Sequence, residues 1–314
     1  MLSNLSDGDI RLLRIFVKVV EAGGFSAAQI DLNISQSTIS THMTALEQRL
    51  GVRLCRRGRS GFSLTEKGQR IHQAALQLFA SMDAFRTEAG AVRDRLVGRL
   101  AIGLVDNIVT NPASHLEEAI EALNRQAPEV EIAVHVVAPT DLERGVLDGK
   151  FDLGLGACGR HSPNLTYEDV FDEQQILYCG RGHPLFERNS EIALKDLKSQ
   201  QLVRRAYAAP DLFPANMRPP ARAVADLMES VALLILSGRY IGFLPQHFAQ
   251  HWVDQGRMRP LLAGRLGYRN PIYLTMRKSD RPSPVIGAFL KEFHRVHGLS
   301  AGTDKSGQRL RRTG

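Results

Sequence analysis

Residues 22–68 read AGGFSAAQIDLNISQSTISTHMTALEQRLGVRLCRRGRSGFSLTEKG, and their punctuation decides the fold of the N-terminal part. Just before them, apolar residues recur at helical spacing until a glycine pair ends the helix. Ser26 is placed to cap a second, short helix, and Ser35 to cap a third over Gln36–Leu50 that Gly51 ends. Two helices joined by a tight turn in this way are typical of a helix-turn-helix.

The third helix has an apolar face and a polar front. Its buried positions are expected at Ile39, Met43, Leu46 and Leu50. In a helix-turn-helix this helix enters the major groove with its leading residues at the base edges. Gln36 can read adenine, and short hydroxyl side chains make smaller contacts. The residues of this helix that we expect at DNA are Ser35, Gln36, Ser37, Thr38, Ser40, Thr41 and His42.

A basic hairpin with glycines at its tip is expected next, over residues 52–64. Residues 49–70 hold 7 basic side chains against the single acid Glu66. Such a cluster alone is equally compatible with a solvated surface. Because it follows the polar front of the third helix directly, the two together indicate a nucleic-acid partner. The arginines that we expect along the phosphates are Arg53, Arg56, Arg57 and Arg59.

The formal net charge of +7 is unevenly distributed. Residues 1–95 carry 13 Lys and Arg against 9 Asp and Glu, and residues 301–314 carry 4 against 1. Residues 96–300 carry 23 of each and are neutral. The positive charge therefore belongs to the DNA-directed part and to a basic tail, which we expect to be disordered over residues 299–314.

The N-terminal residues resemble the winged helix-turn-helix of the LysR-type transcriptional regulators. The matching runs are residues 24–28, 35–37, 46–47, 50–54 and 64–68, together with Ser40. Arg57 falls on the usual wing arginine of the family, whereas Cys55 stands where the family usually has an aromatic residue. We add Ser26 and Thr65 to the candidate DNA-binding residues. The resemblance implies a sequence-specific DNA-binding transcription regulator.

After Thr65, a plausible cap, the chain is expected to be helical to about residue 96. Apolar or small residues alternate at steps of four and three, at Ile71, Ala75, Leu78, Met82, Phe85, Ala89 and Val92. This period favours pairing with another helix, and so a homodimer, although a helix packed on its own domain is the alternative. By resemblance, the linker helix of the family dimerises and tetramers are usual. Two recognition helices held together read an interrupted palindrome in double-stranded DNA.

From residue 99 the pattern changes to alternating strands and helices. Strands are expected over 100–104, 131–137, 151–155, 175–179, 202–205, 241–244 and 272–276, and helices over 112–125, 140–147, 225–236 and 284–297. Such alternation predicts an α/β fold with a parallel sheet covered by helices.

This half also resembles the LysR-type effector domain, through residues 99–103, 149–154, 182–185 and 242–245. The resemblance implies two Rossmann-like lobes, as in a periplasmic binding protein, with a small-molecule effector between them. The expected division of the chain is a winged helix-turn-helix over 1–64, a linker helix over 65–96, an effector domain over 97–298 and a tail over 299–314. By resemblance, lobe one spans about 99–170 plus 272–298, and lobe two about 171–271.

Ligands of parallel sheets bind beyond the carboxyl ends of the strands. The strand ends and the family's usual positions give six candidate effector-binding residues, Asp106, Asn107, Thr140, Arg204, Arg205 and Tyr207. Asp106 departs from the Ser or Thr that the family often has there. Arg204 and Arg205 could attract a carboxylate, which suggests an anionic effector, but they could equally be structural or solvated.

Other chemistries find little support in the sequence. Residues 154–159 match G-x-G-x-x-G, but the residues after them do not begin a helix, so a dinucleotide site is not expected. His247 and His251 lie one helical turn apart without a third ligand, and so do His294 and His297, so no metal site is expected. No G-x-S-x-G, C-x-x-C or P-loop occurs, and we expect neither an enzyme nor a cofactor.

The cysteines and the hydropathy bound the location of the protein. The sequence holds only Cys55, Cys158 and Cys179, too scattered for a disulfide framework. Cys158 or Cys179 could sense oxidants, but buried inert thiols are the commoner case. No long apolar run and no secretory signal occur, so a cytoplasmic protein is expected.

Three classes of function compete at this point. The first is a ligand-responsive transcription regulator, and the second is a DNA-architectural protein whose C-terminal half only assembles. The third, an enzyme or solute receptor with a basic arm, lacks a catalytic constellation and an export signal. The long, charge-balanced α/β half exceeds what assembly requires, which favours the regulator.

Overall fold

The computed structural model describes residues 4–58, 61–91, 95–159, 161–206, 212–278 and 282–299. Arg59, Val92, Tyr207 and residues 300–314 lie outside the described residues, as does the side chain of Arg57. The chain divides into two compact units, an N-terminal one of Met1–Arg86 with Asp148–Lys150 and a C-terminal one of Thr87–Leu147 with Phe151–Gly314. Each unit is described by itself. Within the described residues, no helix is both long and apolar enough to cross a membrane.

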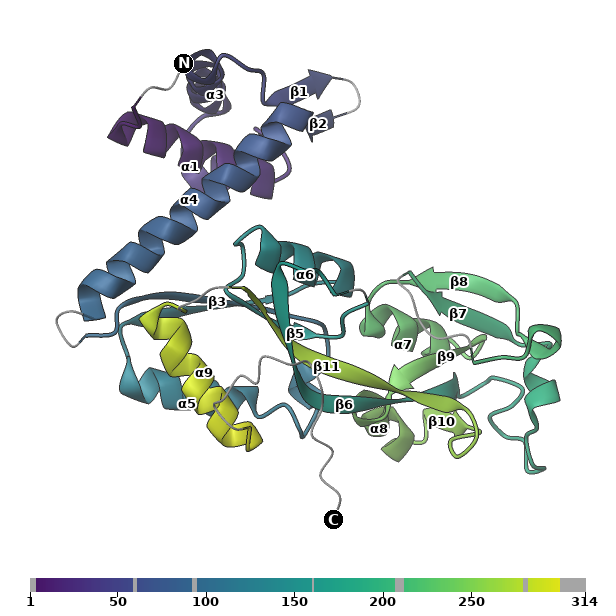
Figure 1. Ribbon diagram of the computed structural model, residues 1–314. Coiled ribbons are helices and arrows are strands. Elements are labelled where there is room, and N and C mark those ends of the chain that lie inside the picture. The colour runs from purple at the N-terminus through teal and green to yellow at the C-terminus, as the bar shows by residue number, and fades with distance from the viewer. Residues whose placement is uncertain are drawn as a thin grey trace. The chain divides into compact units, whose positions relative to one another are not determined.

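Local capping signals define the helices of the N-terminal unit. These helices are α1 (Asp7–Glu21), α2 (Ala28–Leu32), α3 (Gln36–Leu50) and α4 (Glu66–Ala91), labelled in Figure 1 except for α2. The Ser35 hydroxyl accepts a hydrogen bond from the Thr38 N–H at 3.2 Å, and Gly51 ends α3 with a φ of 68°. Both ends of α3 therefore lie where the sequence predicts them.

The start of α2 differs from the prediction. Its N-cap is Ala27, which makes no side-chain hydrogen bond, so the expected cap at Ser26 is wrong. Ala27 already has helical backbone angles, because a turn before α2 winds into the helix. Ser26 contributes its backbone carbonyl instead, which accepts a hydrogen bond from Gln29 Nε2 at 3.1 Å.

The wing is an antiparallel hairpin of β1 (Cys55–Gly58) and β2 (Gly61–Leu64). Glu47 of α3 ties the hairpin to the helix, because its Oε1 accepts hydrogen bonds from the backbone N–H groups of Leu54 at 2.7 Å and Cys55 at 3.2 Å. Helix α4 lies close to the same segment. A β-carbon at Gly68 would be 2.0 Å from the Leu54 carbonyl oxygen, so only glycine allows this approach.

The apolar core of the N-terminal unit joins α1, α3 and the wing. Five of its residues, Phe16, Val19, Ile39, Leu46 and Leu54, have no exposed surface. Side chains from the first turns of α4 pack against this core. The wing and α4 are therefore part of the folded unit that presents α3.

A mixed sheet forms the C-terminal unit, in the order β4-β3-β5-β11-β6-β9-β7-β8, with β10 paired to β6. The strands are β3 (Gly98–Leu104), β4 (Val130–Val136), β5 (Leu153–Gly156), β6 (Leu165–Gly180), β7 (Gln201–Arg205), β8 (Ala221–Ala225), β9 (Tyr240–Pro245), β10 (Met258–Leu261) and β11 (Gly267–Arg277). Figure 1 shows β6 and β11 side by side, antiparallel, between two groups of strands. Within each group the neighbouring strands β3, β4 and β5, or β7, β8 and β9, pair in parallel.

Helices cover both groups of strands. They are η1 (Ile108–Thr110), α5 (Leu116–Gln126), α6 (Pro139–Leu147), η2 (Leu194–Leu197), η3 (Ala215–Met217), α7 (Met228–Leu236), α8 (Gln246–Asp254) and α9 (Pro284–His297). Lobe one is hereafter β3, β4 and β5 with η1, α5, α6, α9 and the adjoining ends of β6 and β11. Lobe two is β7, β8, β9 and β10 with α7, α8 and the other ends of those two strands.

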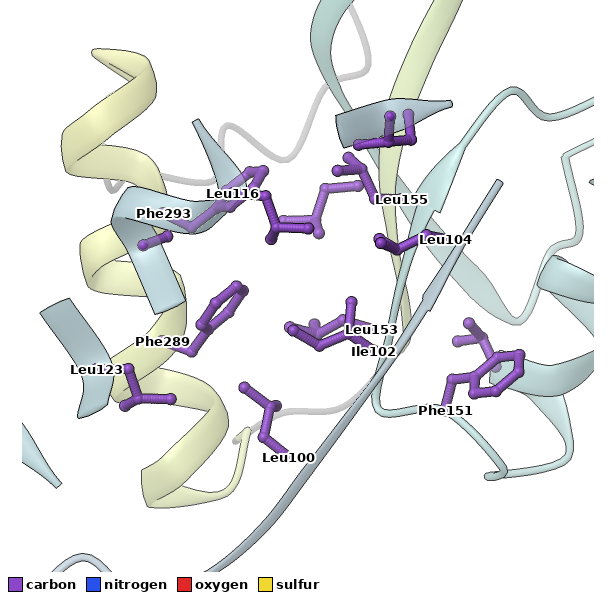
Figure 2. Close-up of a cluster of buried hydrophobic side chains, with 14 of the residues drawn as sticks. Leu100, Ile102, Leu104, Leu116, Leu123, Phe151, Leu153, Leu155, Phe289 and Phe293 are labelled. Atoms are coloured by element: carbon purple, nitrogen blue, oxygen red, sulfur yellow. The ribbon is translucent and has the colours of Figure 1, made fainter. Parts of the chain in front are cut away.

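Each lobe has its own apolar core. In lobe one, leucines and an isoleucine of β3 and β5 meet Phe289 and Phe293 of α9 and Leu123 of α5 (Figure 2). Lobe two has two clusters, one centred on α7 and one around Leu177, Leu197 and Leu261. Separate cores joined by two long strands confirm the prediction of a two-lobed α/β fold.

Several element boundaries differ from the predictions. The helix that was expected to reach about residue 96 is shorter, because α4 is Glu66–Ala91 and the described residues 95–97 are not helical. Strand β11 begins at Gly267 instead of residue 272. Helix α5 begins at Leu116 instead of residue 112, because His115 adopts the left-handed conformation and the Asn111 side chain turns the preceding segment. Helix α7 begins at Met228 instead of residue 225, since the residues before it pair with β7 as β8. The strand expected over 175–179 is the end of the longer β6, which pairs with β11.

Candidate functional site

The leading turn of α3 presents the predicted polar front. Ser35, Gln36, Ser37 and Thr41 are exposed. Thr38, Ser40 and His42 are partly buried, so they border the front instead of forming its centre. The Ser35 hydroxyl shares hydrogen bonds of 2.8 Å with the hydroxyls of Ser37 and Thr38, which fixes the first turn.

Gln29 of α2 holds the start of α3, a role that the sequence reasoning missed. Its Oε1 accepts a hydrogen bond from the Gln36 N–H at 3.0 Å, while its Nε2 donates to the Ser26 carbonyl. The first N–H groups of a helix have no partner within the helix, so this bond satisfies one of them. The backbone of Gln36 is thereby fixed at the start of α3, and its side chain is exposed at the surface.

The wing and its flanks present part of the predicted basic surface. Arg53 and Arg56 are exposed. Thr65 has a structural role, because its hydroxyl donates to the Arg53 carbonyl at 2.7 Å and accepts from the Gly68 N–H at 2.9 Å. The second bond makes Thr65 the predicted cap of α4. Ser26 is exposed before α2.

An ion pair that the sequence reasoning missed joins α1 to the last turn of α3. Arg49, in the last turn of α3, donates through Nη2 to Asp9 Oδ2 of α1 at 2.7 Å. Asp9 is 1% exposed, and hydrogen bonds from Ser6 and then from Arg49 hold the pKa of its carboxyl below the usual value. The pairing fixes the end of the recognition helix opposite Gln36.

The heptad positions of α4 divide into two groups. Ile71, Ala75 and Leu78 pack on the core of the N-terminal unit. For these three positions the alternative prediction, a helix packed on its own domain, is therefore the one that applies. Farther along, Phe85 is 73% exposed and Ala89 is also exposed. The exposed positions of this apolar pattern therefore lie in the second half of α4.

Asp106 lies where lobe one meets lobe two. It follows β3 and is 9% exposed. Its Oδ2 accepts a hydrogen bond from the Met228 N–H at the start of α7, in the other lobe. Burial raises the pKa of the Asp106 carboxyl, while this hydrogen bond and the charge of Arg205 oppose the rise.

Of the other candidate residues that the structure describes, Arg205 belongs to the same buried region as Asp106, Asn107 follows Asp106 directly, and Thr140 and Arg204 lie at the surface. Arg205 is 7% exposed, and its Nη2 donates to Gln175 Oε1 at 2.6 Å. Arg204 is exposed, and so is Thr140 near the start of α6. Asn107 follows Asp106 in the left-handed conformation, with its Oδ1 buried and without a hydrogen-bond partner among the described residues.

A second set of polar groups links the lobes and was missed in the sequence. His247 of α8 lies between Glu173 of β6 and Thr110 of η1, with its Nε2 3.0 Å from Glu173 Oε1 and its Nδ1 2.8 Å from Thr110 Oγ1. Glu173 is 3% exposed and also accepts from Gln175 Nε2 at 2.9 Å. The Asp106 and His247 contacts thus belong to one buried polar cluster through Glu173, Gln175 and Arg205.

The glycine motif and the thiols have structural explanations. Gly156 ends β5, and a β-carbon there would lie 2.5 Å from Val105 Cγ1, so the glycine serves packing. The next described element is the strand β6, not a helix. Burial raises the pKa values of Cys158 and Cys179 to about 12, which favours the protonated thiol over the nucleophilic thiolate.

The histidine pairs also have protein partners. His294 lies 3.0 Å from Glu168, and His297 Nδ1 lies 2.8 Å from the Phe293 carbonyl oxygen. Among the described residues, no group of three or more His, Cys, Asp or Glu side chains could hold a metal ion.

Two family models match the chain. The family described as "Bacterial regulatory helix-turn-helix protein, lysR family" matches residues 10–69, and "LysR substrate binding domain" matches residues 93–297. The HTH-type transcriptional activator BauR of Pseudomonas aeruginosa is 41% identical over 292 residues, or 92% of this chain and 96% of that protein. The HTH-type transcriptional regulator CbbR of Xanthobacter flavus is 24% identical over 93% of this chain and 88% of its own length.

Full-length solved structures share the fold. CbnR complexed with its target DNA superposes with a TM-score of 0.61 at 20% identity, over 92% of this chain and 99% of that one. LysG from Corynebacterium glutamicum with bound effector Arg gives a TM-score of 0.53 at 14% identity, over 92% and 97%. The order of N-terminal helices, long α4 and two-lobed α/β unit is therefore that of known full-length proteins.

Proposed function

Because the chain belongs to the LysR family of bacterial transcription regulators, which bind DNA and are not enzymes, we propose that its N-terminal unit reads an interrupted palindrome and that a small molecule between the lobes controls this reading. In this proposal residues 1–64 bind DNA and residues 65–96 link and dimerise. Residues 97–298 bind the effector, and residues 299–314 form a basic tail.

The exposed polar front of α3 is the observation that carries the DNA-binding proposal. Ser35, Gln36, Ser37 and Thr41 are exposed there without long charged neighbours in the same turn. Short polar groups on a rigid helix suit the donors and acceptors of base edges. We assign base reading to Gln36 and phosphate contact to the wing arginines, including Arg56.

The second half of α4 supports a homodimer. Met82, Phe85 and Ala89 fall at steps of three and four, and so on one stripe of the helix. Full burial of a side chain the size of Phe85 stabilises by about 1.5–3 kcal/mol, which a partner helix provides when it packs on the stripe. The dimer would hold two copies of α3 on two half-sites. The tetramer that is usual in the family stays a prediction.

The buried polar cluster supports an effector site between the lobes. Asp106 and Arg205 come from different lobes and are nearly buried. Of the two arginines that suggested an anionic effector, the buried Arg205 carries the proposal and the exposed Arg204 does not. A ligand bound at this junction would change how firmly the lobes hold together, and so shift the populations of assemblies on DNA.

Footprinting tests the function as a whole. A regulator protects a discrete site with two half-sites, and the pattern changes with a metabolite. Uniform protection of unrelated DNA would instead favour an architectural protein.

The effector is sought by thermal shift with a panel of organic acids, on wild type and on Arg205→Ala. An acid that stabilises only the wild type supports the site, and a panel without any Arg205-dependent shift counts against an anionic effector.

A further inference from the structure

The start of α7 and the guanidinium of Arg205 lie together, and both favour a negative charge. Met228 contributes the first N–H of α7, a helix of nine residues. The first N–H groups of a helix point away from it and favour negative charge. Arg205 lies against the same residue, since its Nη2 is 3.1 Å from Met228 Sδ. A helix start and a buried arginine beside it both attract a carboxylate.

That place already holds a carboxylate, which comes from the other lobe. Asp106 Oδ2 accepts the Met228 N–H, and the charge of Arg205 acts on the same carboxyl group. Its position is not that of a surface aspartate, because only 9% of the residue is exposed. The side chain therefore stands as an internal anion between lobe one and lobe two.

The environment holds Asp106 without fully compensating for its burial. Burial and the nearby charge of Glu173 raise the pKa of the Asp106 carboxyl, whereas the hydrogen bond from Met228 and the charge of Arg205 lower it. The net direction for Asp106 is upward, with burial as the largest cause. A carboxylate held at such a cost is one that a better-placed external carboxylate can displace.

We propose that Met228 N–H and Arg205 form a carboxylate site that the chain fills with its own Asp106, and that a carboxylate-bearing effector binds by taking the place of Asp106. This inference rests on the proposed effector site and gives it a chemical class. Replacing Asp106 removes a direct hydrogen bond between the lobes, while His247 keeps its contacts with Thr110 and Glu173. Effector binding thereby exchanges one tie between the lobes for another.

Chemical rescue tests the site without knowledge of the effector. Asp106→Gly removes the CH₂ and carboxylate groups, and acetate supplies a methyl group and a carboxylate of the same size. Asp106→Ala keeps the β-carbon, so only the smaller formate fits. The readout is thermal unfolding of the full chain, followed by fluorescence of Trp252, the single Trp, which lies in α8 of lobe two.

Acetate is expected to raise the Tm of Asp106→Gly by about 4 °C when it is in about tenfold excess over its dissociation constant. Formate acts on both variants, and acetate acts less on Asp106→Ala. Wild type gains no more from either anion than from chloride at the same ionic strength. The matched control Asp169→Gly, which removes an exposed aspartate of β6, also follows the chloride series.

Arg205 provides the second arm of the experiment. In Asp106→Gly combined with Arg205→Gln, the rescue by acetate is lost. Equal shifts for Asp106→Gly and Asp169→Gly, or rescue that persists without Arg205, would overturn the inference. If the glycine variant does not fold, titration calorimetry of formate into folded Asp106→Ala gives the same decision, with absence of binding as the contrary result.

The outcome is separable from that of the proposed function. Failure of rescue removes the carboxylate site but leaves the footprint and its response to metabolites untouched. A footprint that is uniform over unrelated DNA removes the regulator, whatever acetate does to Asp106→Gly.

Discussion

Gly68→Ala tests the close approach of α4 to the Leu54 backbone, just before the wing. The added β-carbon would lie 2.0 Å from the Leu54 carbonyl oxygen, whereas ordinary contact begins at 3.4 Å. The obstacle is backbone, and the Thr65 N–H binds the same oxygen at 2.9 Å, so it cannot turn aside as a side chain would. Overpacking of this kind costs about 1–3 kcal/mol, and here we expect the upper end.

Alanine also favours a helix over glycine by up to about 1 kcal/mol, which offsets part of the loss. The expected net result is a free energy of unfolding of the N-terminal unit lower by about 2 kcal/mol, or a Tm lower by about 10 °C. The assay is far-UV circular dichroism of the full chain on heating. Fluorescence of Trp252 serves as an internal reference, because it reports lobe two and is expected to stay unchanged.

Gly8→Ala is the matched control, because Gly8 lies in α1 of the same unit and a β-carbon there meets only Ser6 Oγ, at 3.6 Å. This variant is expected to be as stable as the wild type or slightly more so. If Gly68→Ala had the same Tm as Gly8→Ala, the close approach of α4 to Leu54 would be refuted.

Three further predictions concern charge, assembly and pH. Arg56→Ala is expected to weaken binding to all DNA sequences alike and to lower the salt slope by about one, measured by titration at several salt concentrations; a changed base preference with an unchanged slope would contradict the phosphate role. Phe85→Glu is expected to convert the dimer into monomers in sedimentation, whereas the exposed Gln77→Glu leaves it intact; an unchanged dimer for Phe85→Glu excludes this stripe as the interface. Asp9→Asn removes a carboxylate whose pKa is lowered in the folded state. The stability advantage of the wild type over this variant is therefore expected to be full above pH 3.8, the ordinary pKa, and to decline as the pH falls through the lower folded-state pKa. A difference in Tm that stays constant over this range would contradict the assigned ion pair and hydrogen bonds.

Elements with local end signals could be predicted from the sequence. Helix α3 has its cap at Ser35 and its end at Gly51, and α9 has Ser283 and Pro284 at its start. In these cases the signals lie within a few residues of the boundary. The boundary of α7 depended instead on β8, which exists because it pairs with β7, and no local signal announces that pairing.

The candidate sites were predictable to different degrees for the same reason. The front of α3 follows from one helix, so its residues share a face by periodicity alone. The cluster around Asp106 draws on β3, the middle of β6, α7 and α8, which meet only in the folded chain. Strand ends pointed to Asp106 and Arg205, but Glu173 and Gln175 lie inside a long strand and gave no such signal.

The division of α4 illustrates a limit of periodicity. A repeat of apolar residues at steps of four and three predicts which side chains of a helix are covered. It does not predict whether its own unit or another helix covers them. Its first half, including Ala75, is covered by the core of its own unit, and its second half, including Phe85, is not. One continuous pattern therefore spans a covered part and an exposed part of the same helix.

Selection of binding sites from random DNA tests the central claim most directly. The wild-type chain is expected to enrich an interrupted palindrome with two similar half-sites, as two copies of α3 require. Gln36→Ala is expected to lose preference at symmetric positions of both half-sites while keeping their spacing, because it removes a base contact and leaves the dimer intact. Enrichment of no motif, or the same motif and preference with Gln36→Ala, would contradict the account.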